Sequence, residues 1–223
     1  EWSKKQFLKK LPQFYHKSKK LIVIHQSINQ KKINFNNKKK KITFVGKLNS
    51  AKGFDLFSKA IIKILNEYPE WKAYVAGDEP RENIVVNHKN LINLGFQDHN
   101  KILNLFEKSS IAVTCSRWQE PFGRTSLEAS SRGCAVIISN KGGLPETITD
   151  GIILRKLDVN NVYKSIKKLI LNKKQLKNLQ INSYKNFYLT DLFISKKIDN
   201  YRNEIIKKEK NTNIVRNSLK RLK

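Results

Sequence analysis

Methionine is absent from this chain of 223 residues, which begins with Glu1-Trp2-Ser3, and we therefore expect it to be a piece of a longer protein. Only two cysteines are present, which excludes a disulfide scaffold and is typical of a reducing compartment. No apolar run approaches the roughly 18 residues that a membrane-spanning helix needs. Acidic residues are scarce: 18 Asp and Glu stand against 45 Lys and Arg, which gives a net charge of +27.

The positive charge has three competing interpretations. Most of the basic residues are lysine, in runs such as 38–41, and an AT-rich genome produces this mixture with Asn and Ile without any selected partner. A basic surface also attracts an anionic membrane or nucleic acid. The sequence contains no arginine cluster, no RNA-binding aromatic motif and no zinc-finger spacing, so only charge favours nucleic acid. At 39% hydrophobic residues, the chain can still bury a proper core.

The first 40 residues differ from the rest and are expected to be the tail of another domain followed by a linker. A short basic helix is predicted at residues 3–11 and a short strand at 20–24. Residues 30–41 are polar and charged without hydrophobic periodicity, which is typical of a linker.

From residue 42 onward, short apolar segments alternate with segments of helical spacing. Strands that are apolar on both faces and separated by helices predict a doubly wound, parallel, Rossmann-like α/β domain over 41–190. Residues 191–223 are expected to form a C-terminal helix and a basic tail that frays after 211. The predicted strands are 42–45, 71–76, 91–94, 111–115, 135–138 and 152–154, and the predicted helices are 54–68, 100–108, 122–132, 159–172, 174–187 and 191–209.

The loop after the first of these strands is suited to a diphosphate. Lys47 and Lys52 lie between Gly46 and Gly53, and a helix follows. Glycine lets the backbone approach a ligand closely, and a helix N-terminus offers unpaired amides. A solvated basic loop is the alternative. Neither a Walker loop nor a Gly-x-Gly-x-x-Gly fingerprint is present.

The loop after the strand at 111–115 places one acidic residue on each side of a helix start. Glu120 precedes Pro121 and Gly123, and Glu128 follows about two turns into the helix. The two carboxylates are placed to reach both ends of a ligand that lies across the helix N-terminus. An ordinary ion pair with Arg124 or Arg132 is the alternative.

A third loop follows the strand at 135–138 and contains a glycine pair. Gly142 and Gly143 precede Leu144-Pro145-Glu146. Such a pair lets the backbone wrap a ligand before a helix begins, and a plain turn is the alternative.

The three loops in this order, Gly-Lys-x4-Lys-Gly, Glu-Pro-Phe-Gly-x4-Glu-Ala and Gly-Gly-Leu-Pro-Glu, resemble one family. The chain resembles the C-terminal, donor-binding domain of a retaining family 4 (group 1) glycosyltransferase of the GT-B fold over roughly residues 42–171. The resemblance implies an absent N-terminal domain that binds the acceptor, with residues 1–40 as its last helix and strand. The helix from about 191 would cross back to that domain.

The activity that the resemblance implies is sugar transfer from a nucleotide-diphosphate sugar, with retention of anomeric configuration and without a divalent metal or other cofactor. The implied acceptor is a glycan or lipid-linked glycan in cell-surface polysaccharide or lipopolysaccharide assembly. A cytoplasmic enzyme, peripheral on the inner face of an anionic membrane and without a nucleic-acid partner, fits these implications. The piece alone is expected to bind nucleotide weakly and to transfer little sugar.

The resemblance also gives roles to three charged residues, which form the expected catalytic set. Lys47 and Lys52 would hold the pyrophosphate, although the family usually has arginine at the first position, and lysine lacks its bidentate fork. Glu120 would contact the donor sugar near the reacting carbon. Glu128 would accept hydrogen bonds from the ribose hydroxyls.

The remaining expected donor contacts are mostly backbone groups. The amides of Phe122 and Gly123 would face the sugar, and those of Thr125 and Ser126 the phosphates. Phe96, next to Gly95, would edge the base. The other expected donor-site positions are Gly46, Gly142, Gly143 and Arg124, which replaces a usually apolar residue and has an open role.

Other reactive residues are expected to be structural. The scattered histidines have no acid or cysteine at metal-ligand spacing, and His99 is the one near the base-edging loop; the four are His16, His25, His88 and His99. Cys115 and Cys134 are expected to be small buried apolar residues. Trp118 either stacks on a sugar or packs. The alternative functions are a noncatalytic nucleotide-sugar-binding module and a basic nucleic-acid-binding protein.

Overall fold

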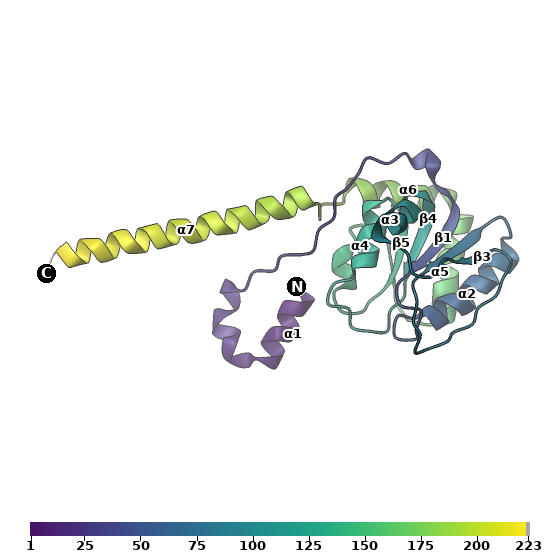
Figure 1. Cartoon of the computed structure of the whole chain (residues 1–223), viewed down its shortest axis with the longest axis horizontal. Helices are drawn as coiled ribbons and strands as arrows, with labels where there is room; N and C mark the ends of the chain where they lie inside the picture. Colours follow the sequence, from purple (N-terminus) through teal and green to yellow (C-terminus); the bar gives the residue numbers. More distant parts are fainter. Residues whose placement is uncertain (222–223) are drawn as a thin grey trace.

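Six parallel strands form one sheet in the order β3-β2-β1-β4-β5-β6. In the computed structural model, which describes residues 1–221 and the side chains of residues 1–209, the prediction of a doubly wound, Rossmann-like domain is confirmed (Figure 1). The strand order reverses between β1 and β4, so a crevice opens at their carboxyl ends. The strands are β1 (Lys39–Val45), β2 (Lys72–Ala76), β3 (Leu91–Asn93), β4 (Ser109–Thr114), β5 (Ala135–Ser139) and β6 (Ile152–Leu154).

Helices cover both faces of the sheet. On one face, α2 (Phe54–Glu67) and α5 (Val159–Leu171) bury their apolar sides against alternate residues of the strands. On the other face, α3 (His99–Lys108) and α4 (Arg124–Ser131) cover the intervening residues. Helix α6 (Lys173–Lys185) contacts both α4 and α5. All five residues of β5 are buried, as the prediction of strands with two apolar faces requires.

The N-terminal segment confirms the predicted helix but not the predicted strand. Helix α1 (Trp2–Lys10) is followed by the 3-10 helix η1 (Pro12–Lys20). The strand predicted at 20–24 is wrong: residues 21–27 alternate in exposure as a strand does, yet no neighbouring strand pairs with them among the described residues. The one pairing nearby is an isolated bridge between Ile28 and Thr190. A period-two pattern predicts a strand only where a partner is available.

The predicted linker at 30–41 extends too far, because β1 already begins at Lys39. The residue before this strand, Lys38, has a structural role. The side chain is partly exposed, but its ammonium group is enclosed and donates to the carbonyls of Phe106 (2.9 Å), Ser109 (2.8 Å) and Arg132 (2.6 Å). Burial lowers the pKa of Lys38. One cation thus satisfies carbonyls near the C-terminal ends of α3 and α4.

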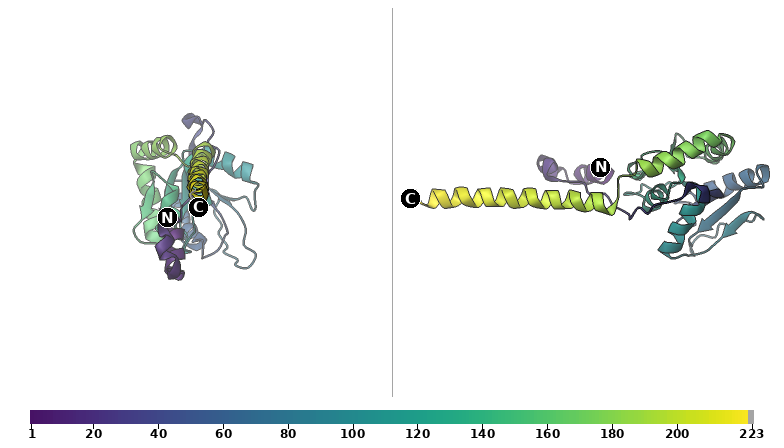
Figure 2. Two further views of the ribbon diagram at one scale, coloured as in Figure 1. Left: turned by 90° about the vertical axis from the view of Figure 1, so that its left-hand side faces the viewer. Right: turned by 90° about the horizontal axis from the view of Figure 1, so that it is seen from above.

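The last helix is longer than predicted. Helix α7 (Asp191–Arg221) continues through the stretch that was expected to fray, and residues 222–223 lie outside the described part. Figures 1 and 2 show α7 projecting from the sheet domain as a single helix, on the same side as α1. That it crosses to another domain stays a prediction. Among the described residues, no helix has the length and apolar character to cross a membrane.

Candidate functional site

A cavity of about 370 Å³ lies at the carboxyl ends of β1 and β4, where the strand order reverses. We call it the first cavity. In open parallel sheets, ligands bind at this point, outside the carboxyl ends of the strands. Its walls combine the ends of both strands with the loops singled out from the sequence: Phe44, Val45, Gly46, Lys52, Thr114, Glu120, Pro121, Phe122, Gly123, Arg124, Thr125 and Leu144, together with Gln26 from the N-terminal segment.

Lys52 and Glu120 meet inside this cavity. The Lys52 ammonium lies 2.5 Å from Oε1 of Glu120, which also accepts a hydrogen bond from Ser116 Oγ at 2.9 Å. The Glu120 side chain is 12% exposed, and that of Lys52 is 33% exposed. The structure therefore brings together one predicted cation and one predicted acid in a partly shielded setting, where a charge pair interacts more strongly than at an open surface.

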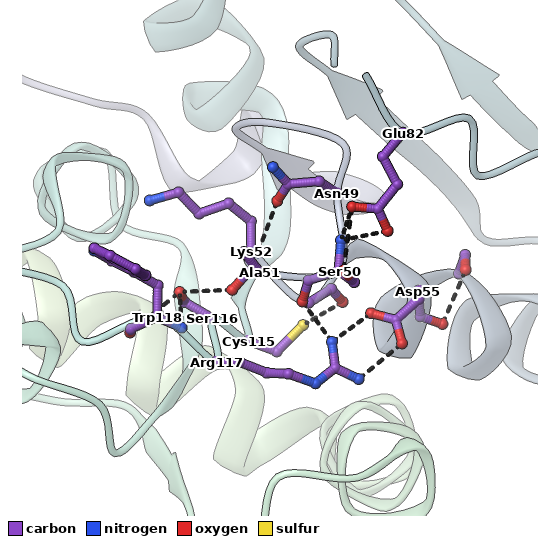
Figure 3. A network of polar contacts seen from close by, with 12 residues as sticks. Asn49, Ser50, Ala51, Lys52, Asp55, Glu82, Cys115, Ser116, Arg117 and Trp118 are labelled. Carbon is purple, nitrogen blue, oxygen red and sulfur yellow. Dashed lines mark hydrogen bonds and ion pairs between the residues drawn. The ribbon is translucent and has the colours of Figure 1, made fainter. Parts of the chain in front are cut away.

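The loop before Lys52 is fastened to the loop before Glu120 (Figure 3). Arg117 donates to both carboxylate oxygens of Asp55, at 2.6 and 2.7 Å, and to the carbonyl of Ser50. The backbone amide of Trp118 donates to the Ala51 carbonyl at 3.1 Å. These contacts hold the two loops in register, and no sequence motif predicted them, because the partners are 62 residues apart.

Arg117→Ala is expected to lower the free energy of unfolding by about 1 kcal/mol at pH 7, since the pair is bidentate but partly exposed. The hydrogen bond from Arg117 lowers the pKa of Asp55. A carboxylate with a lowered pKa stabilises the fold above its unfolded pKa, so the effect should vanish as the pH falls from about 4 through the lowered pKa. Urea unfolding at pH 7 and pH 3 measures it.

Lys101→Ala is the matched control for this prediction, because Lys101 and Asp98 form an exposed pair at 3.3 Å. Its effect should stay below about 0.5 kcal/mol at both pH values. An Arg117→Ala loss that is equal at pH 7 and pH 3 would contradict a contribution from the ion pair.

The glycine pair of the third loop lies against Glu120. The Gly143 amide donates to the Glu120 carbonyl at 2.7 Å, and Gly142 has a φ of +60°. A Cβ atom on Gly142 would lie 2.1 Å from the Glu120 carbonyl oxygen. This loop thus supports the turn that carries Glu120 and leaves no room for a side chain.

Helix α4 begins at Arg124, two residues later than predicted, after Gly123 with a φ of +117°. Gly123 supplies no side-chain cap, so the first amides of the helix remain available toward the first cavity. Ser126 Oγ donates to the Gly123 carbonyl at 2.9 Å and lies 2.6 Å from Thr147 Oγ1. The Ser126 hydroxyl is therefore used within the protein, so Ser126 can offer a ligand mainly its backbone amide.

Glu128 is buried, and the ion pair with Arg124 that the sequence offered as the alternative is present. Its Oε1 accepts hydrogen bonds from Arg124 Nε at 2.8 Å and from His99 Nε2 at 2.9 Å. The side chain is 7% exposed. Arg132, the other expected partner, instead donates to the Asn29 carbonyl. The sequence indicated His99 only through its closeness to the base-edging loop.

A second cavity of about 290 Å³ adjoins the first and shares Val45 and Gly46 with it. Lys47, Phe96 and Gln97 line it, and Phe96 is 75% exposed. Lys47 is exposed and has no hydrogen-bond or ion-pair partner within residues 1–209. The two lysines predicted for one pyrophosphate thus line adjacent cavities.

The other reactive residues are mostly structural. Cys115 and Cys134 are buried free thiols, and burial raises the pKa of Cys115 to about 12. His25 Nε2 lies 2.9 Å from Glu146 Oε2, and Trp118 is 61% exposed. Among the residues whose side chains are described, no group of three or more His, Cys, Asp or Glu could hold a metal ion.

Comparison with known proteins gives a consistent result. The family model described as "Glycosyl transferases group 1" matches residues 25–186. Spore coat protein SA of Bacillus subtilis is 32% identical over 126 residues, which are 51% of this chain and 33% of that protein. The lipopolysaccharide core biosynthesis mannosyltransferase LpcC of Rhizobium leguminosarum is 32% identical over 117 residues, 48% of this chain and 33% of that protein. The chain spans about a third of the length of these curated relatives.

Solved structures share the fold. The C-terminal domain of a group 1 family glycosyl transferase (LpcC) from Francisella tularensis superposes with a TM-score of 0.58 at 28% identity, over 65% of this chain and 82% of that one. Anabaena HepE in complex with UDP-glucose gives a TM-score of 0.65 at 17% identity, over 74% and 49% of the two chains. The six-stranded sheet and its helices therefore match the C-terminal domains of GT-B glycosyltransferases.

Proposed function

Since this chain belongs to the group 1 family of glycosyltransferases, we propose that it is the donor-binding part of an enzyme that moves a sugar from a nucleotide-diphosphate sugar to an acceptor. The observation that carries the proposal is the first cavity, where Lys52, Glu120 and the uncapped start of α4 meet at the switch point of the sheet. A cation and a helix N-terminus favour a diphosphate, and a carboxylate favours sugar hydroxyls.

The two cavities suggest how the donor lies. The base occupies the second cavity beside Phe96 and Lys47, and the sugar occupies the first beside Glu120. The diphosphate then lies across the amides of Thr125 and Ser126 with Lys52 next to it. Glu128, whose partner Arg124 lines the first cavity, accepts hydrogen bonds from the ribose.

The proposed reaction follows the retaining, family 4 type. The bond between the anomeric carbon and the diphosphate oxygen breaks, and a bond from the acceptor oxygen to the same face of that carbon forms. Lys52 and the positive end of α4 stabilise the charge that develops on the departing diphosphate, the role that a divalent metal has in other transferases. The departing phosphate oxygen accepts the acceptor proton, and Glu120 orients the sugar.

The acceptor and the cellular setting belong to the same proposal. An N-terminal domain of the complete protein supplies the acceptor site, and the acceptor is a glycan or lipid-linked glycan in cell-surface polysaccharide or lipopolysaccharide assembly. The name of the Rhizobium relative supports this setting. The net charge of +27 supports contact with an anionic membrane surface from the cytoplasmic side.

Calorimetric titration of the chain with UDP, GDP and ADP tests the proposal. We expect one diphosphate to bind and Glu128→Ala to weaken it by roughly tenfold, since a hydrogen bond to a charged group contributes about 1.5–3 kcal/mol. Duplex DNA at two salt concentrations is the rival ligand. Indifference to all three nucleotides beside tight, salt-sensitive DNA binding would reject the proposal.

The noncatalytic alternative needs a second measurement. The complete protein, with its acceptor domain, should release the diphosphate from a nucleotide sugar in the presence of a chelator. Donor binding without any release of diphosphate would identify a nucleotide-sugar-binding module instead.

A further inference from the structure

The carboxylate of Glu128 is held by only one of its two oxygens. Both His99 Nε2 and Arg124 Nε donate to Oε1, at 2.9 and 2.8 Å. Oε2 has no partner among the side chains and backbone groups that the structure describes. In that part of the chain, every fully enclosed side-chain polar atom except Ser130 Oγ has a hydrogen-bond partner. Because Oε2 of Glu128 has no partner and is not such an exception, it must be open to solvent. The structure thus presents a fixed carboxylate with one free oxygen.

The two partners of this carboxylate lie in or near the walls of the two cavities. Arg124, the first residue of α4, lines the first cavity. His99, the first residue of α3, follows two positions after Gln97, which lines the second cavity. In the donor arrangement proposed above, the ribose joins the contents of the two cavities, and the proposal assigns it to Glu128, because one partner of Glu128 lines the first cavity and the other is two residues from the lining of the second.

We propose that His99 is a positioning residue for the ribose: it fixes Glu128 so that Oε2 accepts the ribose hydroxyls, and it thereby gives the site its preference for ribonucleotides over 2′-deoxyribonucleotides. This inference rests on the proposed function and names the feature of the donor that the site selects. His99 does not itself touch the donor.

Arg124 cannot fix Glu128 alone. Its side chain is 57% exposed and comes from the same helix as Glu128, four residues away, so the pair is weakened by solvent. Its guanidinium also lies at the helix end where the diphosphate is proposed to bind, and an arriving anion competes with Glu128 for it. The His99 side chain is 49% exposed, so solvent weakens its bond too, but that bond comes from another helix and does not involve the helix end where the phosphate is proposed to bind. It is therefore the contact that holds the carboxylate when the donor is bound.

A merely structural role for His99, as a fastening between α3 and α4, makes a different prediction. Loosening the packing of the two helices would weaken the binding of every nucleotide by the same factor. Releasing the Glu128 carboxylate would weaken only those nucleotides whose 2′-hydroxyl it binds. The ratio of the affinity for the ribonucleotide to the affinity for the 2′-deoxyribonucleotide separates these roles, whereas a single dissociation constant does not.

The test measures dissociation constants of UDP, GDP and ADP and of dUDP, dGDP and dADP by calorimetry. For the diphosphate that binds, we expect His99→Ala to reduce the preference for the ribose form by about tenfold, the equivalent of one hydrogen bond to a charged group. His99→Gln, whose amide also donates, should restore part of it. His88→Ala is the matched control, because His88 contacts Asn66 and lines neither cavity.

The outcomes are separable. An unchanged preference in His99→Ala, with both forms weakened equally, would overturn the inference in favour of a structural role. An unaltered chain that binds a diphosphate without preferring the ribose form would also overturn it and leave the proposed function standing. If no diphosphate binds to the unaltered chain, the proposed function fails and the inference fails with it.

Discussion

Lys52→Ala is expected to weaken the binding of a nucleoside diphosphate by roughly a hundredfold. The variant loses a charge-assisted hydrogen bond to the phosphate, worth about 1.5–3 kcal/mol. It also leaves Glu120 without its cation, so a largely buried carboxylate faces an incoming anion with only Ser116 Oγ as a partner. The two effects add, and calorimetric titration of the folded variant measures their sum.

A double-mutant cycle separates the two effects. In Lys52→Ala/Glu120→Gln the unpaired charge is gone, so we expect this double variant to bind the diphosphate about tenfold more tightly than Lys52→Ala does. Lys59→Ala, which removes an exposed lysine from α2, should leave binding unchanged. Lys47→Ala should cost only about threefold, because Lys47 is exposed in the second cavity. A double variant no better than Lys52→Ala would show that Glu120 does not oppose the diphosphate.

The fold was predictable because its signals are local and repeated. Each strand of the sheet is a short apolar run, and each intervening helix has its own periodicity, so most boundaries agree to within two residues. The predictions that failed concern residues whose role depends on partners far away in the sequence. The pattern at 20–24 is that of a strand but has no neighbour to pair with, and Lys38 was taken as part of a solvated run although three carbonyls enclose it.

The site was predictable only in outline. Glycine and charge spacing indicated which loops carry the cavity, because the carboxyl ends of parallel strands share one edge of a sheet. The partners of the charges were not predictable. His99 and Glu128 are 29 residues apart and lie on different helices, and Asp55 and Arg117 are 62 apart. Such contacts follow from how α3, α4 and the loops pack, which no local pattern encodes.

Gly142→Ala is expected to lower the free energy of unfolding by about 3 kcal/mol or more and to abolish diphosphate binding. Two costs combine. An alanine at a φ of +60° costs about 1 kcal/mol, and its Cβ would lie 2.1 Å from the carbonyl oxygen and 2.6 Å from the amide nitrogen of Glu120. Backbone atoms cannot rotate away as a side-chain end does, so the turn that positions Glu120 has to move.

Gly95→Ala carries the first cost alone, so its comparison with Gly142→Ala isolates the second. Gly95 has a φ of +62°, nearly that of Gly142, but a Cβ there meets nothing within 4 Å. The conformational strain is therefore matched, and Gly95→Ala should lose only about 1 kcal/mol in urea unfolding. The difference between the two variants measures how firmly the third loop is held against the backbone of Glu120. Equal losses would mean that this turn shifts without cost, and the position of Glu120 would then depend on Lys52 and Ser116 rather than on the glycine pair.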